Sequence, residues 1–187
     1  MKRFQSRKAA VLLALALPAA ASSTAATMQL VKTEGTLSVS NASGRGLSVM
    51  DNMRLYNGYS VETKASSYAW VKLDGSKLAK LDAASKVEIR KSGSKLEILA
   101  KSGNIFFNVS EPLTGSETLN IRTSTAIVGI RGTSGWVNAV ELYILEGTVE
   151  CIVTNPATGE AEAVTVSSGG MARLITDPDR TDGSEST

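Results

Sequence analysis

The stretch Lys72-Leu-Asp-Gly-Ser-Lys-Leu-Ala79 decides the fold class, because a close copy follows eighteen positions later as Arg90-Lys-Ser-Gly-Ser-Lys-Leu-Glu97. In each copy a glycine-containing turn separates two short segments of alternating apolar and polar residues. Glycine supplies the positive φ of a tight turn, and Asp and Ser bond their own backbone there. A further break at residues 82–85 lies between the copies, so strands recur about every nine residues. The pattern predicts successive β-hairpins.

The same alternation extends along most of the chain in both directions. The segments that we predict as strands are residues 61–63, 69–73, 87–90, 96–99, 105–109, 119–123, 141–145, 149–153, 164–166 and 171–175. A βαβ fold would need intervening helical segments of about 10–15 residues, and the sequence has no such pattern. It therefore predicts an all-β fold, either a rolled sandwich or a short solenoid-like stack of antiparallel or mixed strands.

The period of two assigns faces to the aromatic strands. If Ala69 and Val71 point inward, Tyr68 and Trp70 point outward, and Phe106 points outward when Phe107 is buried. Two interpretations stay open for the outward rings. Another segment covers them, since single exposed apolar side chains are common, or they form a binding platform.

The first 26 residues have the three parts of a secretory signal peptide. Residues 1–8 are basic, residues 9–17 are an unbroken apolar run, and small residues follow to Ala26. The run is shorter than the ~20 residues that span a bilayer, although an uncleaved anchor remains the alternative. We expect a leader helix over residues 1–26 and an exported product, whether periplasmic, cell-surface or extracellular. Membrane contact is expected only through the leader, if it is not cleaved.

Charge and composition exclude several classes of partner. The chain has 20 Lys+Arg and 18 Asp+Glu, and four of the basic residues lie in the leader, so the expected mature chain carries a net charge of −2. Nucleic-acid binding is not expected of such a domain. Residues 177–187 contain no apolar side chain and are predicted to be a disordered acidic tail, which leaves residues 27–176 as one β domain.

Catalytic chemistry finds little support in the sequence. The chain has no His and one Cys, which excludes a Ser-His-Asp triad, an imidazole metal ligand, a Cys-rich zinc site and an internal disulfide. The carboxylates are scattered and are explained by solvated strand faces, and Cys151 is interpreted as a small core residue. We therefore predict no catalytic residue, no cofactor, no metal and no enzymatic activity.

One segment, Arg122-Thr-Ser-Thr-Ala-Ile-Val-Gly-Ile-Arg-Gly-Thr133, resembles the signature of FecR domains. Residues 57–63, the turn at residues 74–76 and the segment Leu145-Glu-Gly-Thr-Val-Glu150 are similar to other parts of that family's pattern. The resemblance covers about residues 30–175. The signature residues singled out for a structural or contact role are Arg122, Thr123, Thr125, Gly129, Arg131 and Gly132.

This resemblance implies an all-β extracytoplasmic domain without known catalysis. In the best-known members the domain lies in the periplasm behind one transmembrane helix and relays the state of an outer-membrane siderophore transporter to a sigma factor. This chain instead starts with an apparent leader and has no long apolar helix. We therefore expect the domain and its protein-contacting character to carry over, rather than sigma-factor control.

The signature also has a local interpretation. Thr123, Thr125 and Thr133 favour strand geometry. Gly129 and Gly132 indicate a bulge or a close backbone approach. The two arginines in this segment have two interpretations: they pin a corner of the roll, or they clamp an anionic or carboxylate ligand with their bidentate forks.

The function that we predict is an exported, non-catalytic FecR-like module with a sensory, regulatory or scaffold role. It would bind a protein partner at the cell envelope through outer strand faces and unpaired sheet edges. The alternative is a glycan or wall-polymer binder that uses Tyr68, Trp70 and Phe106.

Overall fold

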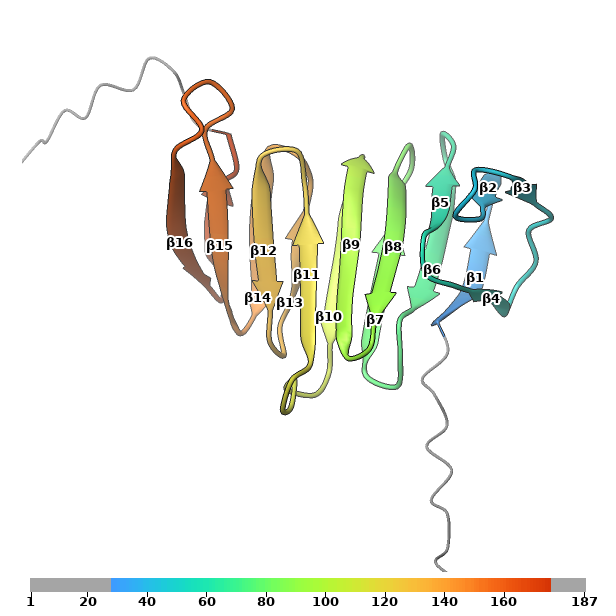
Figure 1. Ribbon diagram of the computed structural model, residues 1–187, viewed down its shortest axis with the longest axis horizontal. Helices are drawn as coiled ribbons and strands as arrows, with labels where there is room; N and C mark the ends of the chain where they lie inside the picture. The colour runs from blue at the N-terminus through green and yellow to red at the C-terminus, as the bar shows by residue number, and fades with distance from the viewer. Residues whose placement is uncertain (1–27, 176–187) are drawn as a thin grey trace, which may run out of the picture.

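The computed structural model describes residues 28–175, which form seventeen strands and no helix. The strands make two sheets that lie face to face (Figure 1), so the predicted all-β class is confirmed. No helix among these residues is long and apolar enough to cross a membrane. The predicted leader helix over residues 1–26 and the predicted tail over residues 177–187 lie outside the described residues.

Each sheet is continuous from one end of the molecule to the other. The eight-stranded sheet has the order β17 (Met171–Arg173), β14 (Glu141–Glu146), β13 (Ser134–Val137), β10 (Ile105–Val109), β7 (Lys77–Leu81), β6 (Tyr68–Lys72), β1 (Met28–Glu34) and β4 (Met53–Leu55). The nine-stranded sheet has the order β16 (Ala161–Ser167), β15 (Thr148–Thr154), β12 (Ala126–Ile130), β11 (Thr118–Arg122), β9 (Lys95–Ser102), β8 (Lys86–Ser92), β5 (Tyr59–Thr63), β2 (Leu37–Ser40) and β3 (Gly46–Leu47).

The chain builds the two sheets alternately as it advances along the long axis of the molecule (Figure 1). The β6–β7 hairpin belongs to the eight-stranded sheet and the β8–β9 hairpin to the nine-stranded one. Strand β10 then crosses back as a single strand, so β9 and β11 become parallel neighbours. The other strand pairings among the described residues are antiparallel, and the result is the mixed, solenoid-like stack predicted from the turn spacing.

The core lies between the sheets and is built from the inward half of each alternating strand. Ala69, Val71 and Phe107 are at most 1% exposed, as the period of two predicts. The largest side chains that are fully buried include Phe107, Leu81, Ile98, Ile121 and Leu142. Each such side chain contributes roughly 1.5–3 kcal/mol on burial, which makes this layer the main stabilising feature of the fold.

Buried hydroxyl groups organise the corners where the chain crosses between the sheets. The Ser85 Oγ donates to the Asn104 carbonyl and accepts the Asn104 N–H, both at 3.0 Å. The Thr63 Oγ1 accepts the Ser85 N–H at 2.9 Å. Gly103, at φ +78°, lies so close that a Cβ there would be 2.2 Å from the Ser85 Oγ. Successive corners are therefore locked onto one another.

Candidate functional site

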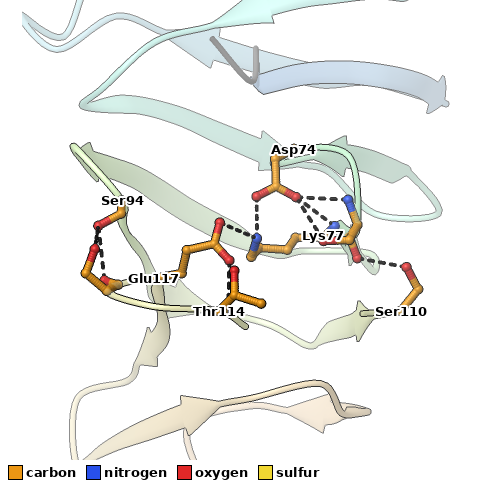
Figure 2. Close-up of polar contacts among 8 residues, drawn as sticks. Asp74, Lys77, Ser94, Ser110, Thr114 and Glu117 are labelled. Atoms are coloured by element: carbon orange, nitrogen blue, oxygen red, sulfur yellow. Dashed lines mark hydrogen bonds and ion pairs between the residues drawn. The ribbon is translucent and has the colours of Figure 1, made fainter. Parts of the chain in front are cut away.

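A buried ion pair holds the turn between β6 and β7. The Lys77 ammonium is 2.5 Å from the Asp74 Oδ2 and 3.6 Å from the Glu117 Oε1 (Figure 2). The Lys77 side chain is 4% exposed and the Asp74 side chain 11%. The Asp74 Oδ1 also accepts the backbone N–H groups of Ser76 and Lys77, both at 3.0 Å. One carboxylate thus closes the turn and neutralises a cation that would otherwise be buried alone.

The same cluster fastens the loop that follows β10. The Ser110 N–H and its hydroxyl both donate to the Ser76 carbonyl, at 3.0 and 3.2 Å. The Glu117 Oε2 accepts the Thr114 N–H at 3.2 Å, while the other oxygen of that carboxylate faces Lys77 (Figure 2). The loop over residues 110–117 is therefore tied to the β6–β7 hairpin, more than thirty residues earlier in the sequence.

The electrostatics of this cluster favour an ionised acid. Burial raises the pKa of Asp74, but the hydrogen bond from the Lys77 ammonium and the one from the Ser76 N–H outweigh it, so the net pKa lies below the ordinary 3.8. An acid kept ionised and paired in this way does not act as a proton donor near neutral pH. The cluster is a structural clasp, and sequence reasoning recognised only its Asp-Gly-Ser turn. Lys77, which directly follows this turn, was the residue in the sequence that could have pointed to the ion pair.

The predicted platform residues lie on the outer face of the eight-stranded sheet. Tyr68, Trp70 and Phe106 are half-buried there. Phe106 pairs across the strands with Trp136, which in turn pairs with Tyr143, and the ring centroids are 5.3 and 5.9 Å apart. Sequence reasoning missed these last two rings, because nothing in the sequence shows that β10, β13 and β14 are neighbours.

Two lysines connect the rings into a single row across the sheet. Lys80 lies opposite both Phe106 and Trp70 in the strand register, and its ammonium is 5.5 Å from the Trp70 ring. Lys32 lies opposite Trp70 on the other side, with its ammonium 4.5 Å from that ring. We call the five residues Trp70, Lys80, Phe106, Trp136 and Tyr143 the aromatic row.

The FecR-like signature forms the β11–β12 hairpin and its turns rather than one cluster. Arg122 ends β11 and pairs with Glu97, the Nε and Oε1 atoms being 3.0 Å apart. Arg131 follows β12 at the opposite end of this hairpin, beyond the Leu119–Ile130 pair. The two arginines are thus about four strand residues apart, roughly 13 Å, and the structure does not bring them together as one clamp.

The signature threonines lie in turns, so the expectation that they occupy strands is wrong. Thr123 is buried, and its Oγ1 accepts the backbone N–H groups of Thr125 and Ala126, at 3.2 and 3.0 Å. Thr125 lies in the same turn, and its hydroxyl donates to the Ala139 carbonyl at 3.4 Å. Thr133 precedes β13. At Thr123 and Thr125, hydrogen bonding of the hydroxyl to the backbone outweighs the β-propensity of threonine.

The two signature glycines differ in role. Gly132, at φ +87°, makes the expected close approach, because a Cβ there would lie 3.1 Å from the Pro112 Cα. Gly129 does not form a bulge. It continues the unbroken register of β12 against Glu150 on β15 and against Asn120 on β11. It lines instead a depression of about 590 Å³ on the outer face, which Arg131 also lines.

The nine-stranded sheet ends in a long unpaired edge. Strand β16 has seven residues, and among residues 28–175 it pairs only with β15. Its side chains are exposed except for half-buried Val164 and buried Val166. In the turn that connects β15 to β16, the Asn155 N–H donates to the Glu160 carbonyl at 2.8 Å. Hydrogen-bonded and non-hydrogen-bonded pairs alternate along an antiparallel ladder, and Asn155–Glu160 is a hydrogen-bonded pair. Counting along the register from this pair, residues 162, 164 and 166 bond to β15. Residues 161, 163 and 165 direct their N–H and C=O groups to the free edge.

Groups that could perform metal or thiol chemistry are not assembled among residues 28–175. No cluster of three or more Cys, Asp or Glu side chains that could hold a metal ion occurs there. Cys151 is fully buried, as the sequence predicted for a core residue, and burial raises the pKa of its thiol to about 11. A thiol held in its protonated form is a poor nucleophile.

Comparisons with known proteins agree with the sequence signature. The family model described as FecR protein matches residues 59–150. Two crystal structures of a candidate anti-sigma factor from Parabacteroides distasonis ATCC 8503, at 2.50 and 1.65 Å resolution, are similar to 59% of this chain and 60% of that chain, with 17% identity and a TM-score of 0.45. The match thus spans less than two thirds of that protein. No curated protein is significantly similar to this chain. The segment over residues 59–150, which contains the signature hairpin and the buried clasp, is a FecR domain.

Proposed function

We propose that this chain is an exported FecR-type module that senses or regulates by binding a protein partner at the cell envelope, without catalysis. The observation that carries the proposal is the open edge of β16 at the end of a FecR-domain sheet. The FecR family is regulatory, and a regulatory domain acts through contact. The leader predicted over residues 1–26 supports export.

An exposed edge strand is a template for a partner strand, because its free backbone groups supply a complete row of hydrogen bonds. Natural proteins usually shield such edges with proline, a bulge or an inward charge. Strand β16 has neither a proline nor a bulge among its seven residues, since its register against β15 is regular. Its one charged residue, Glu162, shares the face of Val164 and Val166 and stays exposed at the start of the strand. The opposite end of the nine-stranded sheet is blunted instead, since β3 has two residues.

The surroundings of this edge indicate what kind of strand would bind. Large apolar side chains that are exposed concentrate at the same end of the stack; they are Val140, Leu145, Ile152, Met171 and Ile175, each 39–62% exposed. Residues 136–175 carry five glutamates and one arginine, a net charge of −4. Two such acidic ends would repel each other, so a second copy docked end to end is disfavoured. The surface fits an extended partner segment that carries basic and apolar residues.

Replacing Ala163 with proline is expected to abolish partner binding while the fold survives. Residue 163 directs its N–H to the free edge, so proline removes a donor that β15 does not use, and edge strands tolerate proline. We expect capture of the partner from an envelope extract of the producing cells to fall at least about tenfold relative to the wild-type mature protein, as the loss of an interface hydrogen bond with steric blocking implies. Quantitative mass spectrometry of the retained proteins measures it.

A matched control separates backbone pairing from side-chain effects. Ala163→Thr changes the same position but keeps the N–H, and it should retain the partner. Thermal unfolding of all three proteins verifies that the hairpin remains folded. Retention that is unaffected by Ala163→Pro, or no retention by the wild type above a blank matrix, would count against the proposal.

A further inference from the structure

A second surface, on the opposite side of the molecule from β16's sheet, has the chemistry of a ligand site. The aromatic row crosses the outer face of the eight-stranded sheet in one register line: Trp70 faces Lys80, Lys80 faces Phe106, Phe106 faces Trp136, and Trp136 faces Tyr143. Lys32 extends the line at one end and Met171 at the other. Seven neighbouring strands thus each contribute one side chain to the same line.

The side chains in this row touch one another and remain accessible. The Lys80 ammonium is 4.8 Å from the Tyr68 ring and 5.5 Å from the Trp70 ring, within the range of cation–π contacts. Trp136, which lies between Phe106 and Tyr143 in the row, is 40% exposed. A cluster of aromatic rings that the sheet's own core does not need is unusual on a solvent-facing strand surface and is typical of recognition.

The charges along the row identify the class of ligand. Lys32 and Lys80 are each paired, with Glu34 at 2.6 Å and Asp82 at 2.9 Å, so the positive charge beside the rings is compensated locally. A polyanion such as a nucleic acid would meet these acids as well as the lysines. Because the acids neutralise the two lysines beside the rings, the ligand that fits the aromatic row is uncharged. It must also present C–H groups to the faces of the rings.

Polar groups flank the row on the side toward the sheet corners. Asn138 donates from its Nδ2 to the Asn104 Oδ1 at 2.9 Å. Asn104 directly precedes β10 and Asn138 directly follows β13, so each amide is two residues from the Phe106–Trp136 pair. The Tyr68 ring lies beside Trp70, with centroids 6.4 Å apart. Amide and phenol groups beside aromatic faces are the donors and acceptors that hydroxyl-rich rings need.

We propose that the aromatic row binds a linear, uncharged oligosaccharide laid across the strands. From Trp70 to Tyr143 the row crosses four strand spacings, about 19 Å at the usual distance between strands. This length accommodates several sugar rings in sequence and far exceeds one monosaccharide. The sugar C–H faces pack on the aromatic rings, and the ring hydroxyls bond to the neighbouring amides. The site is separate from the β16 edge.

Calorimetric titration of the mature protein with cellohexaose, maltohexaose and chitohexaose tests the proposal, with glucose and a charged heparin hexasaccharide as comparison ligands. At least one neutral hexasaccharide is expected to bind, and glucose is not. Trp136→Ala should weaken that binding about tenfold or more, since aromatic truncations dominate such contacts. Trp136→Phe should recover part of it. Tyr56→Ala, which removes another exposed ring (55% exposed) outside the row, should bind as the wild type does.

Three outcomes would overturn the proposal: no neutral hexasaccharide binds, only the charged heparin hexasaccharide binds, or Trp136→Ala binds as tightly as the wild type. Loss of protein capture in Trp136→Ala without any saccharide binding would make the row a protein contact, which also overturns it. The result is distinguishable from the test of the β16 edge, because Ala163→Pro leaves the row intact and should leave saccharide binding unchanged.

Discussion

Replacing Asp74 with alanine is expected to lower the free energy of unfolding by about 3 kcal/mol. The change leaves the Lys77 ammonium, 4% exposed, with only the longer contact to Glu117. It also removes the acceptor of two backbone N–H groups in the turn. A buried charge that loses its partner pays most of its desolvation free energy in the folded state. Urea denaturation followed by tryptophan fluorescence measures the effect.

Two further variants show whether the uncompensated charge is the cause. Asp82→Ala removes the same residue type from the more exposed Lys80 pair and should cost about 0.5 kcal/mol. Lys77→Met added to Asp74→Ala removes the buried charge and should recover much of the lost stability. An Asp74→Ala protein that is no less stable than Asp82→Ala would refute the clasp as a stabilising feature.

The stability difference between the wild type and Asp74→Ala should also depend on pH. The pKa of Asp74 in the folded protein lies below its ordinary value of 3.8, so the contribution is fully present above that value. It is lost as the pH falls through the lowered pKa, because the carboxyl then takes up a proton and releases Lys77. Denaturation curves at pH 7, 4 and 2.5 should show the two proteins converging toward the acid end. A difference that stays constant would mean that the carboxylate charge contributes nothing.

Gly103→Ala is the second substitution with a large expected effect, a loss of about 3 kcal/mol. The glycine has φ +78°, where an L-residue costs about 1–2 kcal/mol, and the added Cβ would lie 2.4 Å from the Ser85 Cα. Because that contact is with backbone, the corner must shift, and the hydrogen bonds between Ser85 and Asn104 shift with it. Thermal unfolding by circular dichroism is the measurement.

Gly93→Ala is the matched control for this prediction. Gly93 also has positive φ, at +59°, but nothing lies within 4 Å of the position of its Cβ. It therefore reports the backbone cost alone, about 1 kcal/mol. Equal losses at the two glycines would show that the close contact with Ser85 does not matter and that only conformational strain does.

The sequence determined the fold class because hairpin turns and period-two alternation are local properties. Each of the ten predicted segments overlaps a strand, but seven strands lie outside them: β1, β2, β3, β4, β7, β12 and β13. The β12 segment Ala-Ile-Val-Gly-Ile lacks polar alternation, since its two outward positions are Ile127 and Gly129, and so it gave no period-two signal. The burial of Lys77 could not be predicted either, because Asp74 is a local partner but Glu117, the second acid that faces the ammonium, is forty residues away.

The candidate sites depend on neighbours that no local pattern specifies. Phe106 and Trp136 are thirty residues apart in sequence and pair directly, because β10 crosses to the other sheet as a single strand. The three predicted rings therefore lie on an outer face, as the alternation indicated, but Trp136 and Tyr143 were missed. For the same reason, Arg122 and Arg131 could be predicted only as a pair in sequence, whereas the hairpin separates them.

The strand order also sets a distance between the two ends of the described chain. Met28 starts β1, and Ile175 follows β17, which lies six strand spacings away in the same sheet, about 29 Å at the usual separation. Hydrogen-bonded sheets resist compression along this direction, so the domain behaves as a stiff spacer. Segments that leave the domain at Met28 and at Ile175 therefore start about 29 Å apart.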